Sequence, residues 1–203
     1  MKSLAGLILA AGKSERMGGP KPLLRIFGKT FLENILDEAL RSNLSDVKTI
    51  LGYGADLILE RLPQIRERVI LNPDYESGQL SSIQTGIRSL EESNAEGVML
   101  FLIDHPFVSR DLINTLIDCF SRWSNPIVIP SFQNRRGHPM IFGSEVFEDI
   151  MNAPLDQGAV AVVRKRQNRI LHVQVDEPGI LVDLDTPEAY QQYVVQAGKV
   201  DSK

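Results

Sequence analysis

The chain has 203 residues, of which 43% are hydrophobic and 24% are charged, an ordinary composition for a globular protein. With 26 acidic and 22 basic residues, it lacks the basic excess expected of a protein that coats nucleic acid. Its one cysteine, Cys119, excludes an internal disulfide and a four-cysteine zinc site. The length predicts one domain, over 1–197, with a frayed tail over 198–203. We find no cleavable leader and no apolar run of about 20 residues, so we expect a cytoplasmic protein without membrane contact.

Short apolar runs alternate along the chain with patterns of helical period. In chain order, the predicted elements are a strand at 4–10, a helix at 31–40, a strand at 47–51, a short helix at 57–62, a strand at 68–71, a helix at 80–90, a strand at 98–103, a helix at 112–120, strands at 127–129 and 140–142, short helices at 146–150 and 160–163, strands at 170–175 and 180–184, and a final helix from 187. Thr30 followed three residues later by Glu33 predicts a capping box at the first of these helices.

This alternation predicts an α/β protein: a Rossmann-like three-layer α/β/α fold around a mostly parallel, mixed sheet. In such folds, ligands bind outside the carboxyl ends of the strands. The places to search are therefore the residues just after 10, 71 and 103, and those near 184.

A glycine-rich loop follows the first predicted strand, from Ala10 to Lys21, and carries three glycines and three basic residues. Glycines allow backbone N–H groups to approach an anion, while Arg16 and Lys21 could neutralise phosphate oxygens. The spacing is neither that of a P-loop nor GxGxxG. The residues alone leave open a solvated, flexible loop.

The run Leu9-Ala10-Ala11-Gly12, followed by Ser14, Arg16, Met17, Gly18 and Lys21, resembles the signature loop of nucleotidyltransferases of the MobA/MocA type. The likeness extends over most of the chain and implies transfer of a nucleoside monophosphate from an NTP to a phosphate-bearing acceptor. It implies that Arg16 and Lys21 are catalytic, stabilising charge on the triphosphate. In this family Ala-Ala-Gly accompanies cytidine and Ala-Gly-Gly accompanies guanosine, which favours CTP. The nucleotide-binding residues that the resemblance implies in this loop are Leu9, Ala10, Ala11, Gly12, Lys13, Ser14, Arg16, Gly18 and Lys21.

Carboxylates suited to Mg²⁺ follow two of the predicted strands. Asp104 comes directly after the most apolar run, and Asp183 and Asp185 would share one face of an extended segment. The residues alone leave open that these acids cap turns or helices. The resemblance, through Asp-x-Pro and Asp-x-Asp-Thr-Pro, implies Mg²⁺ held by Asp104, which also binds the nucleotide, with Asp183 favoured as the second ligand and Asp185 as the alternative. His105 is interpreted as structural or solvent-facing.

Two further segments resemble substrate-binding parts of this family. Ser82 stands four residues before Gly86, the spacing at which related transferases contact the base, although simple helix capping is the alternative. The Gly-His-Pro element resembles the acceptor side of MocA-like proteins, and a packed or solvated turn is its alternative. The expected acceptor-binding residues are Arg136, Gly137, His138 and Pro139. The stretch 155–161 departs from the family pattern, because Val160 stands where relatives carry an arginine.

We therefore predict a Mg²⁺-dependent nucleotidyltransferase that uses CTP and the molybdenum cofactor (molybdopterin) as its acceptor and releases pyrophosphate. A molybdoenzyme or its maturation chaperone is a candidate partner, and no nucleic acid is expected. Two alternatives are a transferase of the same fold using GTP, or a sugar or alditol phosphate acceptor, and a non-enzymatic carrier of the molybdenum cofactor. The carrier would need no pair of metal-binding carboxylates.

Overall fold

The computed structural model describes residues 2–155 and 158–200, with side chains to 193. Within these ranges, eight strands form one sheet, and β2 and β3 form a separate hairpin. Seven strands of the sheet lie in the order β10-β7-β9-β6-β1-β4-β5, and β8 pairs with β7. The strands are β1 (Leu4–Ala10), β2 (Arg25–Ile26), β3 (Lys29–Thr30), β4 (Asp46–Leu51), β5 (Val69–Leu71), β6 (Gly97–Leu102), β7 (Ile127–Phe132), β8 (Arg135–Arg136), β9 (Met140–Gly143) and β10 (Ile170–Gln174).

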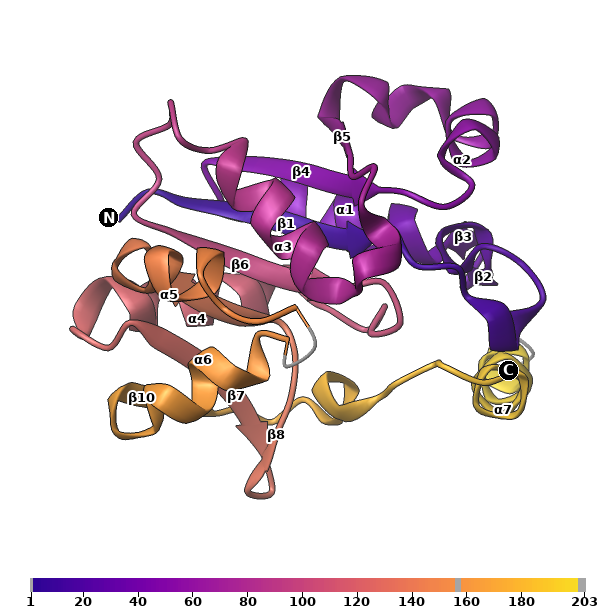
Figure 1. Ribbon diagram of the computed structural model, residues 1–203. Helices are drawn as coiled ribbons and strands as arrows, with labels where there is room; N and C mark the ends of the chain where they lie inside the picture. The colour runs from indigo at the N-terminus through magenta and orange to yellow at the C-terminus, as the bar shows by residue number, and fades with distance from the viewer. Residues whose placement is uncertain (1, 156–157, 201–203) are drawn as a thin grey trace.

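Helices cover both faces of this sheet (Figure 1). One face packs against α3, α5 and α6, and the other packs against α1 and α4. The helices are α1 (Phe31–Leu40), α2 (Ala55–Arg61), α3 (Gln79–Arg88), α4 (Arg110–Arg122), α5 (Phe147–Met151), α6 (Val160–Lys165) and α7 (Pro187–Val200). In the part of the chain described, none of them combines the length and apolarity needed to cross a membrane.

The predicted fold class is confirmed, and the sheet is mixed because β8 and β9 run against the other strands. Strand β9 runs antiparallel to both of its neighbours, β6 and β7, whereas β1, β4, β5 and β6 run parallel. Every residue of β1 is buried, as its continuous apolar run predicts for a central strand covered on both faces. The fold therefore has the three layers expected from the alternation of strands and helices.

The parallel strands end level with one another. Ala10 at the end of β1 lies opposite Leu51, which in turn lies opposite Leu71 at the end of β5. On the other side, Leu9 lies opposite Leu102 at the end of β6. The loops that leave these strands therefore start at one edge of the sheet, where the predicted site residues meet.

The capping box predicted for α1 is present. The Thr30 hydroxyl accepts a hydrogen bond from the Glu33 amide at 3.1 Å, and the Glu33 carboxylate accepts one from the Thr30 amide at 2.9 Å. These two bonds satisfy amides that the first turn of a helix leaves unpaired. The helix then buries Phe31, Leu32 and Ile35 against the sheet.

The strand predicted at 180–184 is wrong. Pro178–Leu181 forms a short 3₁₀ helix, and the residues up to Asp185 have no regular structure. The carbonyl of Ile180 accepts a hydrogen bond from the amide of His138 instead of joining the sheet. Residues 178 and 179 are proline and glycine, which favour a turn over a strand. At the C-terminus, α7 continues to Val200, and 201–203 lie outside the described residues.

Candidate active site

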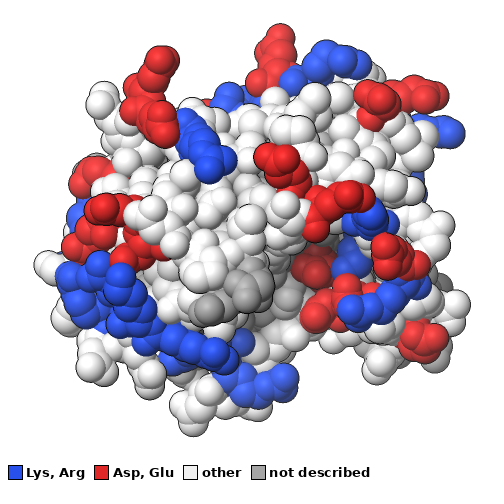
Figure 2. Space-filling view, viewed as in Figure 1, with Lys and Arg blue, Asp and Glu red and all other residues white. Residues whose placement is uncertain are grey.

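A cleft of about 380 Å³ opens at the carboxyl edge of the sheet. Its walls come from the loop after β1, the start of α3, the end of β6 and the segment before α7. In the space-filling view, acidic and basic side chains are mixed around a hollow right of centre (Figure 2). A cleft of this size suits a small ligand with several charges.

The loop after β1 folds back on itself through Ser14. The Ser14 hydroxyl accepts a hydrogen bond from the Lys21 amide at 3.2 Å, and the Ser14 carbonyl accepts one from Met17 at 2.9 Å. Ser14 has a φ of 53° and Gly18 a φ of 68°. A serine in the left-handed region is strained, and such strain gathers at functional sites. Two hydrogen bonds through Ser14 thus turn the loop back on itself.

Lys21 lies at the centre of the charged residues in the cleft. Its side chain is only 7% exposed, and its ammonium group lies 3.3 Å from Asp104 Oδ2 and pairs with Asp185. Arg16, which is largely exposed, pairs with the other oxygen of Asp185. The hydrogen bond from Lys21 holds the pKa of Asp185 below its usual range. Lys21 and Arg16, the two cations expected to act on phosphates, therefore share the carboxylate of Asp185.

Asp183 forms no ion pair with these cations among the described residues and lies in a cluster with Asp104 and His105. One ligand atom from each of the three residues lies within 4.8 Å of the others. The amide of Leu184 donates to the carbonyl of Asp104 at 2.9 Å, which holds the two segments side by side. Partial desolvation, with the nearby Asp104 carboxylate second, raises the pKa of Asp183. Among the described residues, Asp104 Oδ1 is buried and has no hydrogen-bond partner, so this donor set fits a divalent cation.

The structure thus separates the two carboxylates that the sequence had kept as alternatives. Asp185 is engaged by Lys21 and Arg16, whereas Asp183 lies with Asp104. His105, interpreted from the sequence as structural or solvent-facing, lies in the same cluster as the acids.

His138 is the member of the predicted acceptor element that reaches this cluster. Its ring lies 4.7 Å from that of His105, centroid to centroid. Burial, with His105 as the second cause, lowers the pKa of His138 to about 4, so its imidazole is neutral at pH 7. Gly137 packs closely on Ile180: a Cβ added at Gly137 would lie 2.5 Å from the carbonyl oxygen of Ile180.

The other two members of that element lie differently. Arg136 is exposed and contacts His172, with its guanidinium 3.2 Å from His172 Nε2. Pro139 is buried. The element as a whole thus holds one imidazole beside the cluster while Arg136 faces solvent.

Ser82 and its neighbours form the wall of the cleft at α3. Ser82 is buried and accepts a hydrogen bond from the side-chain amide of Asn72 at 3.0 Å, and Ser81 accepts another at 2.9 Å. Tyr75 packs on Gly52, where a Cβ would lie 2.6 Å from that of Tyr75. Asn72, which directly follows β5, therefore positions the serine that the resemblance assigns to the base.

Lys13, which lines the cleft, forms an ion pair with Glu76. Lys13 lies 2.6 Å from Glu76, and both side chains are exposed. The hydrogen bond and charge of Glu76 raise the pKa of Lys13, and Lys13 lowers that of Glu76. This pair joins the loop after β1 to the turn before α3, although exposed pairs contribute little to stability.

Most of the residues predicted to bind the nucleotide line this cleft. Gly18 is the exception, since it forms a turn of the loop outside the lining. The sequence assigned no role in the site to Tyr75, which also lines the cleft. Its only sequence signal is its place between β5 and α3. The predicted residues that line the cleft are Leu9, Ala10, Ala11, Gly12, Lys13, Ser14, Arg16, Lys21, Ser82 and Asp104.

Comparison with known protein families matches residues 6–170 to the MobA-like NTP transferase domain. The chain is 31% identical over 198 residues to the purine catabolism protein PucB of Bacillus subtilis, covering 92% of this chain and 94% of that protein. It is 26% identical to the nicotine blue oxidoreductase of Paenarthrobacter nicotinovorans, with 91% and 93% covered. It is also 26% identical to the molybdenum cofactor cytidylyltransferase of Escherichia coli, with 94% and 95% covered.

Among solved structures, Rv0371c of Mycobacterium tuberculosis superposes with a TM-score of 0.80 at 26% identity. The match covers 96% of this chain and 98% of that one. The similarity therefore includes both the loop after β1 and the C-terminal segment that carries Asp183 and Asp185.

Proposed function

This chain belongs to the MobA-like NTP transferase domain family and is a nucleotidyltransferase, and on that premise we propose the reaction performed in its cleft. The proposed reaction transfers CMP from CTP to a phosphate-bearing acceptor of the molybdopterin type and releases pyrophosphate. Two observations support these substrates: the likeness to the molybdenum cofactor cytidylyltransferase of Escherichia coli, and the Ala10-Ala11-Gly12 run that favours cytidine.

The observation that carries the proposal is the position of Lys21 and Arg16. Both cations lie where the loop after β1 meets Asp185, inside a cleft of suitable size. Transfer of a phosphorus group depends mainly on positioning and on charge stabilisation. Bound triphosphate would compete with Asp185 for these cations, which would then neutralise charge that develops on the phosphates.

The backbone of the loop and the start of α3 would hold the rest of the nucleotide. Ser14, two residues after Gly12, has a left-handed conformation, a geometry in which successive amides can approach phosphate oxygens. Ser82, held by Asn72, would meet the base. Neighbouring Ala11 restricts the room that a second glycine would leave at the base.

Asp104 and Asp183 would hold a divalent cation, expected from the resemblance to be Mg²⁺. Bound there, the cation would supply neutralising charge at the triphosphate. Asp104 is already oriented by Lys21 on one oxygen, which leaves its other oxygen for the cation. Asp185 would instead hold the two basic side chains in place.

The acceptor would enter beside His138. Its phosphate is ionised at neutral pH and can attack the α-phosphorus directly, so no protein nucleophile is required. His138, neutral and partly buried, can hydrogen-bond an acceptor without repelling a cation. Arg136 faces solvent near it and could attract an anionic molecule.

A group of basic side chains on the surface is a further reason to expect an anionic acceptor. Lys and Arg gather at the lower left of Figure 2, over α6 and β8. In chain terms, Arg164, Lys165 and Arg166 end α6 or follow it directly, and Arg135 and Arg136 form β8. Such a surface attracts anions to this side of the molecule, even though Lys165 and Arg166 pair with Asp149.

The direct test measures pyrophosphate release for each of CTP, GTP, ATP and UTP against molybdopterin and against sugar and alditol phosphates. We expect release with CTP and molybdopterin to exceed that of every other pair. Greater activity with GTP, or with a sugar or alditol phosphate, would contradict the proposed substrates. Binding of molybdopterin without any cation-dependent NTP binding would indicate a carrier instead.

A further inference from the structure

His105 is the residue whose predicted role the structure changes most. It occupies the middle of Asp104-His105-Pro106, directly after β6. Its amide donates to the carbonyl of Leu102 at 3.0 Å, which turns the chain sharply at the end of the strand. The turn places the imidazole on the same side as the carboxylates of Asp104 and Asp183, with their ligand atoms within 4.8 Å.

Two buried atoms of this cluster lack a hydrogen-bond partner among the described residues. Asp104 Oδ2 faces Lys21 at 3.3 Å, but Oδ1 has none, and neither has Nδ1 of His105. Buried polar atoms are nearly always paired, so unpaired ones indicate a missing ligand or strain. Here an acceptor oxygen and an imidazole of adjacent residues are both affected, beside a third group of the kind that binds metals.

The surroundings hold the His105 ring in place. The ring of His138 packs against it at 4.7 Å and a tilt of 49°. The Gly137–Ile180 contact and the bond from His138 to Ile180 fix His138 in turn. Packing of this kind limits the rotation of the His105 ring.

We propose that His105 binds the catalytic divalent cation together with Asp104 and Asp183, and that this nitrogen ligand makes the site prefer transition metals such as Mn²⁺ over Mg²⁺. Mg²⁺ favours all-oxygen ligand sets, whereas imidazole suits first-row transition metals. The inference rests on the proposed function only in assigning the cation to nucleotide transfer. The cation and its ligands can be observed without any turnover.

The test uses Mn²⁺ as the probe on the full chain. Binding of Mn²⁺ is measured from the loss of the electron paramagnetic resonance signal of the free ion. A directly bound nitrogen is detected by the ¹⁴N modulation of the electron spin echo. We expect ¹⁴N coupling in the wild-type protein and tighter binding of Mn²⁺ than of Mg²⁺. His105→Gln should abolish the coupling and weaken Mn²⁺ binding by about 10-fold or more, as loss of a supporting group already does.

His172 provides the matched control, because it contacts Arg136 and not the cluster. His172→Gln should keep both the ¹⁴N coupling and the Mn²⁺ affinity, whereas His138→Gln, which removes the ring packed on His105, should keep the ¹⁴N coupling with weaker Mn²⁺ binding. Circular dichroism verifies that each variant is folded. Absence of ¹⁴N coupling in wild-type protein with bound Mn²⁺ would overturn the proposal, even if His105→Gln did not fold. Loss of the coupling in His138→Gln with retention in His105→Gln would overturn it as well.

Pyrophosphate release separates this inference from the proposed function. Release with CTP but no ¹⁴N coupling would leave the transferase reaction standing and overturn the role of His105. Nitrogen coupling without release from any NTP would support His105 as a ligand and overturn the proposed reaction.

Discussion

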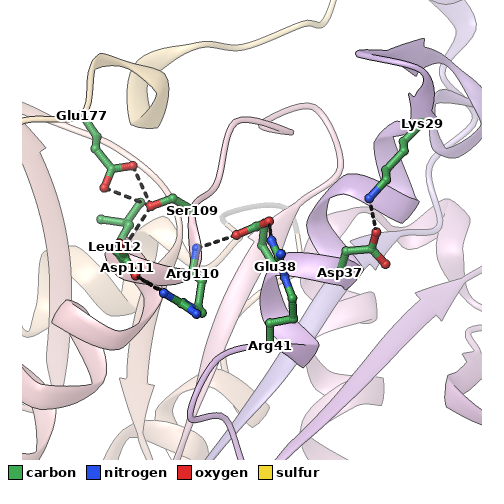
Figure 3. A network of polar contacts seen from close by, with 9 residues as sticks. All are labelled: Lys29, Asp37, Glu38, Arg41, Ser109, Arg110, Asp111, Leu112 and Glu177. Atoms are coloured by element: carbon green, nitrogen blue, oxygen red, sulfur yellow. Dashed lines mark hydrogen bonds and ion pairs between the residues drawn. The ribbon is translucent and has the colours of Figure 1, made fainter.

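Two charged clusters of similar composition lie on this molecule, and they differ in how completely their groups are paired. Figure 3 shows the network that joins α1 to the start of α4. There Lys29 pairs with Asp37 at 2.6 Å, and Glu38 accepts the amide of Arg110 at 2.8 Å. Ser109 caps α4 through the amide of Leu112. In the cleft, by contrast, the charges around Lys21 surround buried atoms that lack partners in the part of the chain that the structure describes.

The comparison shows that neither charge nor size distinguishes the candidate site. The hollow beside the network of Figure 3 measures about 470 Å³ and is larger than the cleft of about 380 Å³. Its polar side chains bond to one another and to helix ends, so they stabilise the fold. The cleft combines a nearly buried lysine, a strained loop and unpaired ligand atoms, which suit a ligand.

The largest difference between the cleft and the network of Figure 3 is expected when one lysine of each is replaced by methionine. Lys21→Met should lower kcat/KM for CTP by about 10²–10³-fold, the usual cost of a group that stabilises transition-state charge. Lys29→Met removes an exposed ammonium with a single carboxylate partner and should leave kcat/KM within about 2-fold. The measurement is steady-state pyrophosphate release. Equal losses in both variants would mean that the cleft is not the active site.

Two aspartates give the next largest effect. Asp104→Asn should weaken divalent-cation binding by about 10–100-fold, because the amide cannot replace the carboxylate charge. Asp37→Asn, which changes the partner of Lys29, should not alter it. Titration calorimetry with Mn²⁺ measures both. Unchanged affinity in Asp104→Asn would place the cation elsewhere.

Within the paired network we expect effects on stability and none on catalysis. Ser109→Ala removes the cap of α4 and should lower the free energy of unfolding by about 1 kcal/mol. Urea denaturation measures the loss, and kcat should remain at the wild-type value. A large fall in kcat at unchanged stability would show that this network also serves the reaction.

The smallest effect is expected at a second paired cluster, between α5 and α6. Hydrogen bonds from Lys165 and then Arg166 lower the pKa of Asp149 from its ordinary value of 3.8. Because the folded pKa is the lower one, this stabilisation is present above the unfolded pKa and is lost as the pH falls through the folded pKa.

Asp149→Asn should therefore lower the free energy of unfolding by about 0.5 kcal/mol at pH 7, as expected for a partly exposed pair. The difference from wild type should shrink as the pH falls below 3.8. Urea denaturation at pH 7 and at about pH 3 measures the change. A difference that grew in acid would contradict the assigned sign.

Much of the fold could be predicted from local patterns in the sequence. The apolar run of β1 and the Thr30–Glu33 capping box act through neighbouring residues, and both are present. The strand predicted at 180–184 is wrong: its apolar residues fit a strand, but the segment begins in a 3₁₀ helix whose Ile180 carbonyl accepts a hydrogen bond from His138. That contact joins segments about forty residues apart, and no local pattern encodes it.

Some residues of the candidate site could likewise be predicted from the sequence, and others could not. The sequence placed Arg16 and Lys21 in the loop after the first strand and Asp104 directly after another strand, and all three line the cleft. It could not show that His105 would join the carboxylates, because a histidine in a turn has no period or spacing that reveals its neighbours. The turn after β6 and the packing of His138 decide that orientation.

The sequence by itself determined the alternation of strands and helices, the loop after β1 and the family to which the chain belongs. These properties depend on residues that are close along the chain or on a motif of fixed spacing. Only the tertiary structure decided that Asp185 meets Lys21, 164 positions away, while Asp183 meets Asp104 and His105. The physical reason is that level strand ends and the docking of the 3₁₀ helix before Asp183 set those distances.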